Sequence, residues 1–277
     1  MPVSIIYKGR FGNAIFQYVT ARIFAEKHRE YLLTPFPYPG VLRPTHFDSG
    51  ESPLKARLSA RFLTKVWIED NEDISPFDRY EGRRNYIFHG YFQDSRLYNQ
   101  NVDQVKSIFA LPVVAEKNYT DIVMHCRLGD FYHDDYLAEG HNDCSEIIHP
   151  HWYVDLLQAE KFQKLHIVLY DHKTPTKYVN RYLSYFEPFK PIVYRKRRAG
   201  LDFHFIRSFD RIICSNSTFS WWAGFLSQAR VIYIPENIGY RGIGANYHKP
   251  GSHIQELWNI RNISKPVMCQ FCDMKAI

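Results

Sequence analysis

The run H-C-R-L-G-D at residues 125–130 contains side chains that can hold an anion or move a proton. An apolar stretch at residues 122–124 precedes the run, so the run is expected where a strand ends in a loop. Arginine is always charged and forks two donors onto phosphate oxygens, which suits Arg127 to holding a diphosphate. His125 and Asp130 have the groups to read a base or accept a proton. The alternative is an ion pair between Arg127 and Asp130 that only caps the loop.

A second polar run, S-N-S-T-F-S-W-W-A at residues 215–223, leads from an apolar stretch into a helical pattern. Free backbone N–H groups and the positive end of the helix dipole favour an anion there, and Ser217 and Thr218 add hydroxyl donors. Helix capping alone explains one Ser or Thr. Because four small polar residues precede paired tryptophans, we interpret the run as an anion-binding loop, with capping as the alternative.

A third feature is the G-x-x-G turn at residues 9–12, followed by Asn13 and, one helical turn later, Gln17. This turn is neither a Walker motif nor a G-x-G-x-x-G fingerprint. Taken alone, it fits an ordinary tight turn as well as a binding loop.

The elements that must position these residues alternate along the chain. Strands are predicted at residues 3–7, 85–89, 122–124, 165–170, 192–194, 211–214 and 231–234, and helices after Asn13 and at 54–66, 151–162, 176–186, 202–209 and 219–226. Strands that alternate with helices imply parallel sheets, which bind ligands at the carboxyl ends of their strands. A break near residue 115 predicts domains over 1–115 and 116–250, with a C-terminal tail over 251–277.

Composition is that of a globular protein: 277 residues, 45% hydrophobic and 23% charged, which excludes disorder, collagen and coiled coil as descriptions of the whole. A net charge of +6 permits an anionic ligand. No run approaches the ~20 apolar residues that cross a bilayer. The five cysteines are odd in number and thinly spread, which favours a reducing compartment. The basic run at residues 195–198 and the 16% aromatic content keep a non-catalytic polyanion or nucleic-acid binder as an alternative.

Four motifs together resemble the family 11 glycosyltransferases, chiefly α-1,2-fucosyltransferases, over residues 3–240. They are G-x-x-G-N-x-x-F-Q-Y at 9–18, G-Y-F-Q at 90–93, H-x-R-x-G-D at 125–130 and the run at 215–223. The resemblance implies a GT-B-like α/β fold, in which two Rossmann-like domains with parallel sheets face a cleft. The N-terminal domain would lie on the acceptor side and the second domain would hold the nucleotide sugar. It also implies inverting transfer of fucose from GDP-fucose to a glycan hydroxyl, with no metal or other cofactor; the sequence contains no D-x-D triplet.

In the expected mechanism Arg127 would stabilise the leaving diphosphate. For the general base, Asp130 is the first candidate and His125 is the second. The resemblance also assigns a role to Asp202. Asp202 matches an acidic position that accepts the N1–H and N2–H of guanine; read by itself, it is a helix N-terminal residue favoured by the dipole. The expected nucleotide-sugar-binding residues are His125, Arg127, Asp202, Asn216, Ser217, Thr218 and Phe219, and the expected acceptor-cleft residues are Gly12, Asn13 and Gln17.

The sequence departs from the family at Leu128, where a second Arg is usual, and at Ala14, where Gln is common. A donor such as UDP-xylose and a glycan-binding relative without catalysis therefore stay open. The expected partners are a nucleotide sugar and a glycan acceptor, not nucleic acid. The chain is expected to be a soluble, cytoplasmic protein of the bacterial or viral type without a transmembrane segment.

Overall fold

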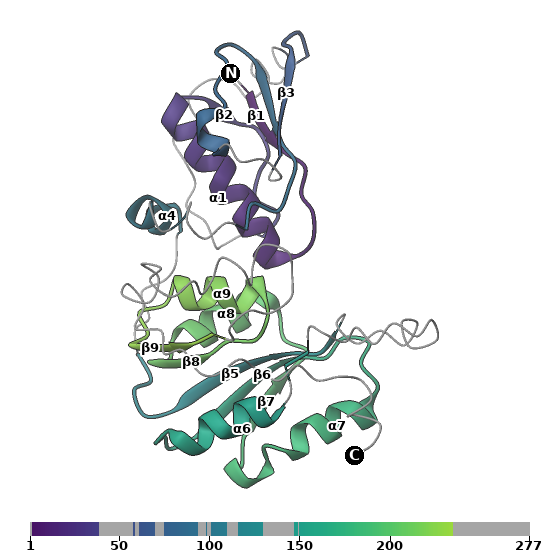
Figure 1. Cartoon of the computed structure of the whole chain (residues 1–277), viewed down its shortest axis with the longest axis vertical. Helices are drawn as coiled ribbons and strands as arrows, with labels where there is room; N and C mark the ends of the chain where they lie inside the picture. The colour runs from purple at the N-terminus through teal and green to yellow at the C-terminus, as the bar shows by residue number, and fades with distance from the viewer. Residues whose placement is uncertain are drawn as a thin grey trace. The chain divides into compact units, whose positions relative to one another are not determined.

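The computed structural model describes residues 2–38, 58, 61–69, 75–93, 98, 101–109, 116–129, 147–148 and 150–234. The chain divides into two units, Met1–Pro112 and Val113–Ile277, close to the boundary expected near residue 115. Each unit is built on its own parallel sheet (Figure 1). The expected tail over residues 251–277 lies outside the described residues.

Unit 1 has a four-stranded parallel sheet in the order β2-β1-β4-β3. Its elements are β1 (Pro2–Ile5), α1 (Phe11–His28), β2 (Tyr31–Leu32), β3 (Lys65–Ile68), the 3-10 turn η2 (Pro76–Asp78), β4 (Asn85–Phe88) and α4 (Val102–Ile108). Helix α1 buries most of its side chains, and it ends at Arg29, which has left-handed backbone (φ 55) and donates its N–H to the carbonyls of Ala25 and Glu26. The strand and helix expected at the start of the chain are confirmed.

The helix predicted over residues 54–66 is wrong at its end, because residues 65 and 66 belong to strand β3. Most of the rest of that range lies outside the described residues. In β3, Lys65 and Trp67 are exposed while Ile68 is buried, as expected of an edge strand. So short a strand with exposed side chains carries no clear apolar alternation, which is why the sequence pattern missed it.

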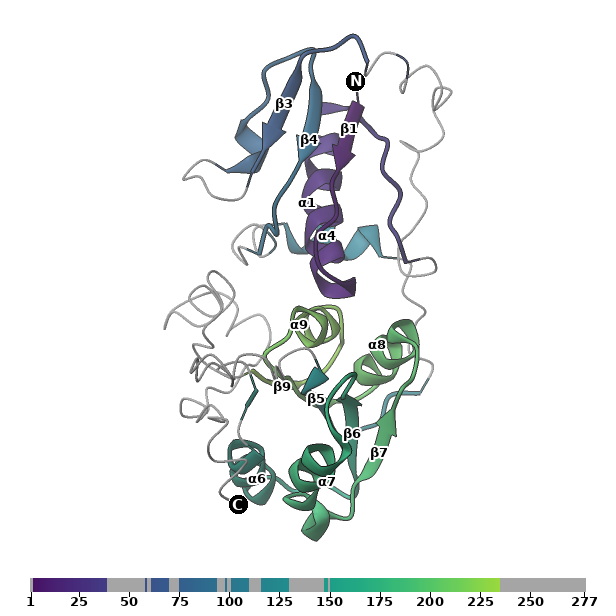
Figure 2. The same cartoon turned by 90° about the vertical axis from the view of Figure 1, so that its right-hand side faces the viewer.

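Unit 2 has a five-stranded parallel sheet in the order β7-β6-β5-β8-β9. Its elements are β5 (Ile122–Arg127), α6 (Pro150–Ala159), β6 (Leu165–Tyr170), α7 (Thr176–Ser184), the 3-10 turn η4 (Glu187–Phe189), β7 (Ile192–Arg195), α8 (Ala199–Arg207), β8 (Arg211–Ile213), α9 (Thr218–Phe225) and β9 (Val231–Tyr233). Helices α8 and α9 cover one face of the sheet, and α6 and α7 cover the other (Figures 1 and 2). This is the doubly wound arrangement that the alternation of strands and helices predicts.

The strand order of unit 2 reverses between β5 and β8. The chain moves outward from β5 to β6 and β7, and then returns to add β8 and β9 on the other side of β5. At such a reversal the loops that follow the two central strands diverge and leave room for a ligand. The fold therefore selects the carboxyl ends of β5 and β8 as the place to look for a site.

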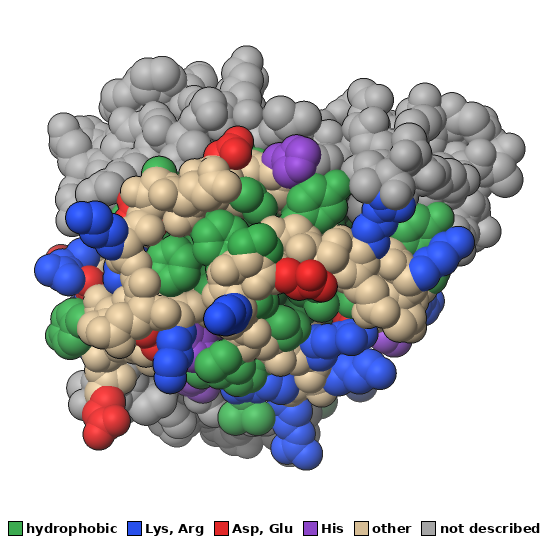
Figure 3. Space-filling model, turned by 90° about the horizontal axis from the view of Figure 1, so that it is seen from below, with side chains coloured by type: hydrophobic (Ala, Val, Ile, Leu, Met, Phe, Trp, Pro, Cys, Tyr) green, Lys and Arg blue, Asp and Glu red, His purple; other side chains and the backbone are tan. Residues whose placement is uncertain are grey.

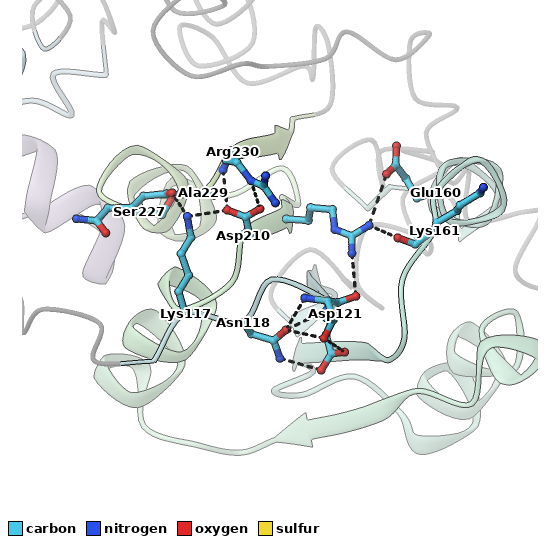
Figure 4. Close-up of polar contacts among 12 residues, drawn as sticks. Lys117, Asn118, Asp121, Glu160, Lys161, Asp210, Ser227, Ala229 and Arg230 are labelled. Carbon is cyan, nitrogen blue, oxygen red and sulfur yellow. Dashed lines mark hydrogen bonds and ion pairs between the residues drawn. The ribbon is translucent and has the colours of Figure 1, made fainter.

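The opposite edge of this sheet, where the strands begin, carries a polar cluster that we call the amino-edge cluster (Figure 4). Asp210, just before β8, pairs with Lys117 Nζ at 2.6 Å and with Arg230 Nε at 2.5 Å. Asp121, just before β5, accepts hydrogen bonds from Asn118 Nδ2 at 2.8 Å and His166 Nε2 at 3.1 Å. These contacts fasten the starts of β5, β6, β8 and β9 to the segment that enters the unit.

On the face seen in Figure 3, Lys and Arg side chains are scattered over the described surface, with several together at the lower right, and Asp, Glu and apolar side chains lie among them. The described surface of this view therefore shows mixed charge rather than a continuous basic stripe. Among the described helices, none has the length and apolarity needed to cross a bilayer.

Candidate functional site

Strand β5 brings the first polar run to the carboxyl edge of the unit 2 sheet. The strand continues to Arg127, beyond the end predicted at residue 124, because Cys126 is buried and extends the apolar pattern. Alternate residues of a strand share a face, so His125 and Arg127 project to one side while Cys126 and Leu128 project to the other. Leu128 is fully buried in the apolar core beside α6 and α7. Leu128, which departs from the motif of the family that the sequence resembles, thus serves packing.

The two polar runs meet at this edge although 90 residues separate them. His125 Nδ1 lies 2.7 Å from Ser215 Oγ, and Arg127 Nη1 donates to Ser217 Oγ at 3.3 Å. Both contacts join β5 to the loop between β8 and α9, across the point where the strand order reverses. The structure therefore places the two sequence-predicted runs in one site, which we call the carboxyl-edge site.

The loop after β8 also forms the N-terminus of α9. Ser217 is the N-cap residue, with extended backbone, and its Oγ accepts a hydrogen bond from Phe219 N at 3.2 Å. Asn216 and Thr218 are buried in the same loop. Capping is thus one role of Ser217, but the same hydroxyl also holds Arg127. The Arg127 guanidinium and the positive end of the α9 dipole consequently lie together, and both favour an anion.

Tyr170, which sequence reasoning missed, helps to position Arg127 from the neighbouring strand. The Arg127 guanidinium carbon lies 5.9 Å from the centre of the Tyr170 ring, at the end of β6. The ring also packs on Gly129, which has φ +28, and a Cβ built there would lie 2.2 Å from Tyr170 Cε1. Gly129 was therefore the signal in the sequence from which a neighbouring side chain could have been inferred, since glycine allows another group to approach the backbone closely.

His125 is neutral at physiological pH. Burial, and next the positive charge of Arg127, lower the pKa of His125 to about 3. Its ring packs against Phe219, with ring centres 5.2 Å apart, and Phe219 in turn packs against Phe203 of α8 at 5.7 Å. The positive charge of the site therefore comes from Arg127 and not from the histidine.

Asp202 stands on a different element of the same unit, in the first turn of α8. Its Oδ1 lies 3.1 Å from Arg197 Nε, and the Arg197 guanidinium lies 5.0 Å and 4.9 Å from the ring centres of Tyr194 and Phe205. Burial raises the pKa of Asp202, and Arg197 opposes that rise. Helix α8 packs against α9, but the ion pair that Asp202 forms is with Arg197 and not with a residue of the loop after β8.

The basic run at residues 195–198 is partly neutralised. Arg195 forms an ion pair with Asp171, and Arg197 forms one with Asp202. Two of the four cations are thus committed to carboxylates within unit 2. This pairing weakens the interpretation of the run as a polyanion-binding patch.

The acceptor-cleft residues predicted in unit 1 surround the turn after β1. Gly9 has φ +74, and a Cβ there would lie 2.2 Å from Asn13 Nδ2, so the turn requires glycine. Asn13 Oδ1 accepts a hydrogen bond from Gln93 Nε2 at 2.9 Å, which joins the first two motifs. Gln17 is fully buried and bonds both the N–H and the C=O of Lys8 at 2.8 Å. The Gln17 amide therefore stabilises the turn through these two hydrogen bonds.

The remaining predicted site residues are Gly12 and Asp130. Gly12 is buried in the first turn of α1, and Asp130 lies outside the described residues. Among the side chains that the structure describes, no group of three or more His, Cys, Asp or Glu is arranged to hold a metal ion.

No protein-family model matches the sequence, and no curated protein matches it. Solved structures match in fold. That of POFUT1 in complex with GDP-fucose covers 86% of this chain and 98% of its own, with a TM-score of 0.50 at 11% identity. NodZ α-1,6-fucosyltransferase with GDP matches at a TM-score of 0.43 (13% identity; 86% and 96% covered), and the E. coli heptosyltransferase WaaC with ADP at 0.45 (12% identity; 89% and 91% covered). With the two parallel sheets, the first match confirms the predicted α/β fold of the GT-B type.

Proposed function

We propose that this chain is a glycosyltransferase that moves fucose from GDP-fucose to a glycan hydroxyl, with inversion at the anomeric carbon and without a metal ion. The observation that carries the proposal is the hydrogen bond from Arg127 Nη1 to Ser217 Oγ, 3.3 Å long, at the N-terminus of α9. It holds a permanent cation beside a helix N-terminus at the reversal point of a parallel sheet. Such a place suits the diphosphate of a nucleotide sugar.

The choice of donor has two supports. The four sequence motifs resemble those of fucosyltransferases, and the structure of POFUT1, whose fold this chain shares, was solved with GDP-fucose. In the proposed complex Asp202 accepts the N1–H and N2–H of guanine. The adjacent Arg197 favours the ionised carboxylate that this contact needs.

The proposed chemistry is a single displacement. The acceptor oxygen forms a bond to the anomeric carbon while the bond from that carbon to the phosphate oxygen breaks, and GDP leaves. Negative charge grows on the diphosphate as it departs, and Arg127 and the α9 N-terminus stabilise this charge from fixed positions. The absence of a D-x-D triplet from the sequence is consistent with a site in which these groups replace a metal ion.

The acceptor hydroxyl must also lose its proton. A histidine whose pKa is lowered to about 3 is a weak base near neutral pH. Asp130 therefore stays the predicted general base. The glycan acceptor and the cytoplasmic location stay predictions as well.

The experiment that tests the proposal compares the thermal stability of the purified chain with GDP, UDP and ADP in the presence of EDTA. A ligand at 100 times its Kd adds about 2.7 kcal/mol to the unfolding free energy. We expect stabilisation by GDP alone and loss of that preference in Asp202→Asn. Equal stabilisation by UDP would exclude GDP-fucose as the specific donor, and no stabilisation by any nucleotide would exclude a nucleotide-sugar site.

A further inference from the structure

A buried chain of hydrogen bonds lies behind His125. From His125 Nδ1 it runs to Ser215 Oγ at 2.7 Å and on to Ser220 Oγ at 3.2 Å. Ser220 Oγ also lies 3.1 Å from the carbonyl oxygen of Ser215 and 3.2 Å from that of Ser217. His125, Ser215 and Ser220 are 4%, 5% and 0% exposed, so the chain must satisfy itself without bulk water.

The direction of this chain follows from counting hydrogens. A carbonyl oxygen only accepts, so the Ser220 hydroxyl donates to the carbonyls and accepts from Ser215. Ser215 has then used its one hydrogen, and its oxygen accepts from Nδ1–H of His125. In the reverse direction, Ser220 would donate to Ser215 and Ser215 to His125, which would leave Ser220 Oγ against two carbonyl oxygens with no hydrogen between them. A third arrangement, in which Ser220 donates to a carbonyl and Ser215 donates to His125, leaves the 3.2 Å contact between the two hydroxyls without a hydrogen. Every contact contains a hydrogen only when Ser220 shares its hydrogen between the two carbonyl oxygens and the imidazole proton is on Nδ1.

A neutral imidazole with its proton on Nδ1 has a lone pair on Nε2. Within the described part of the chain, no group donates a hydrogen bond to Nε2, although the ring is almost completely buried and lies two residues from Arg127 on the same strand face. Both phosphates of a nucleotide sugar are esterified and carry no hydrogen near neutral pH, so they cannot donate to this nitrogen. A hydroxyl can.

We infer that the Ser215–Ser220 chain holds His125 as its Nδ1–H tautomer, so that Nε2 accepts a hydrogen bond from a sugar hydroxyl of the nucleotide sugar. The inference rests on the proposed function and refines it. The phosphates belong to Arg127 and the α9 N-terminus, whereas His125 selects for a polyhydroxylated ligand. This specifies the nucleotide-sugar contact that the motif resemblance gives His125.

The first test reads the tautomer directly. Long-range ¹H–¹⁵N correlation spectra of the full chain labelled at histidine nitrogens identify which ring nitrogen carries the proton, and His125→Asn assigns the signals. We expect His125 to be protonated at Nδ1 only, in the absence of ligand. A proton on Nε2, with or without one on Nδ1, overturns the inference. Ser215→Ala removes the acceptor of Nδ1–H and should mix the two tautomers.

The second test uses two variants, each of which places an amide group at one of the two nitrogen positions of the imidazole. The Asn amide of His125→Asn can still donate to Ser215 but does not reach the position of Nε2, whereas the longer Gln amide of His125→Gln does. Affinities are measured for GDP-fucose, GDP and inorganic pyrophosphate, with the melting temperature as a check on folding. We expect His125→Asn to bind GDP-fucose about tenfold more weakly, with pyrophosphate unchanged, and His125→Gln to recover most of the loss.

The probes separate the possible outcomes. A loss for both GDP and GDP-fucose assigns the hydroxyl to the ribose, and a loss for GDP-fucose alone assigns it to the transferred sugar. An equal loss for pyrophosphate, or no loss for any probe, overturns the inference. If the wild-type chain binds pyrophosphate but neither GDP nor GDP-fucose, the proposed function fails, and the spectrum of the ligand-free chain still decides the tautomer.

Discussion

At the scale of single residues, the carboxyl-edge site separates charge from hydrogen-bond acceptance along one strand face. Arg127 supplies a permanent positive charge. Its guanidinium donates a hydrogen bond to Ser217 and lies 5.9 Å from the centre of the Tyr170 ring. His125, two residues earlier, is kept neutral by burial and by that same charge. The charge of Arg127 therefore helps to keep His125 neutral. Substitution of Arg127 should change turnover, whereas substitution of His125 should change the pH dependence of stability.

Removing the charge should act on the leaving group. We expect Arg127→Ala to lower turnover of GDP-fucose, followed as release of GDP, by about 10²–10³, the usual effect of losing one transition-state donor. Arg127→Lys keeps the charge but loses the fork, and should recover part of the rate. Near-normal turnover in Arg127→Ala would contradict the assignment of Arg127 to the diphosphate.

Removing the histidine should act on the pH dependence of stability. Above about pH 6.5 neither the folded nor the unfolded chain protonates residue 125. As the pH falls below this value, the unfolded chain takes up a proton that the folded chain, with the pKa of His125 lowered to about 3, does not. The unfolding free energy should therefore decrease toward acid pH, with a limiting slope of about 1.4 kcal/mol per pH unit from this residue.

The measurement is urea unfolding of the wild type and of His125→Gln across the acid range. The free-energy difference between the two chains isolates residue 125 from the other titrating groups. A difference that does not vary with pH would show that His125 titrates alike in both states.

At the scale of elements, the loops that follow β5 and β8 position the site, and their close contacts limit which residues they tolerate. Gly129, just after β5, leaves no room for a side chain because the Tyr170 ring occupies the place of a Cβ. Gly200 in α8 has nothing within 4 Å of that place. The two glycines thus form a matched pair for substitution by alanine.

We expect Gly129→Ala to lower the unfolding free energy by about 1–3 kcal/mol through overpacking, and to weaken GDP binding because Tyr170 must move from beside Arg127. Gly200→Ala should be neutral or stabilise by up to about 1 kcal/mol, since alanine is the better helix former. Chemical denaturation and GDP titration of both variants check this. Unchanged GDP affinity in Gly129→Ala would remove Tyr170 from the site.

The sequence pattern identified each of the described strands of unit 2 because each is a short, mostly apolar run between turn or helix signals. It placed the end of β5 too early because His125 and Arg127 read as loop residues, while burial of Cys126 keeps them in the strand. It missed β2, which has two residues, and the exposed edge strand β3. The sheet rule indicated the carboxyl ends of the strands as the binding edge. The hydrogen bond between Arg127 and Ser217, the contact of Arg127 with Tyr170 and the Arg197–Asp202 pair depend on side-chain contacts that periodicity does not encode.

At the scale of the whole molecule, two polar clusters of unit 2 lie at opposite edges of one sheet and have different roles. The carboxyl edge holds the candidate site, and the amino-edge cluster joins the starts of the strands to the entering chain (Figure 4). In that cluster Asp210 is 1% exposed. Burial alone would raise the pKa of Asp210, but the hydrogen bonds from Lys117 and Arg230 outweigh it, so that the pKa is lowered.

We expect Asp210→Asn to lower the unfolding free energy by about 3–5 kcal/mol, because it leaves the partly buried Lys117 without its counter-ion. The exposed pair of Lys27 and Asp78, at 3.3 Å in unit 1, is the control, and Asp78→Asn should cost at most about 1 kcal/mol. Where Asp210→Asn stays folded, its GDP affinity should equal that of the wild type. Loss of GDP affinity without loss of stability would assign the cluster to the site.

The lowered pKa of Asp210 also fixes the sign of its pH effect. Its stabilising contribution is complete above the ordinary pKa of an aspartate and is lost as the pH falls through the lowered value in the folded chain. The wild type should therefore lose its stability advantage over Asp210→Asn only in strong acid.

Because the two clusters lie at opposite edges of the sheet, residues of one can be substituted without disturbing the other. The residues of the amino-edge cluster and those of the candidate site lie at opposite ends of the same strands. Substitutions in the loops after β5 and β8 can therefore accumulate while the fastening stays intact. If the proposed function holds, donor preference can diverge, or be engineered, on unit 2 at nearly constant stability.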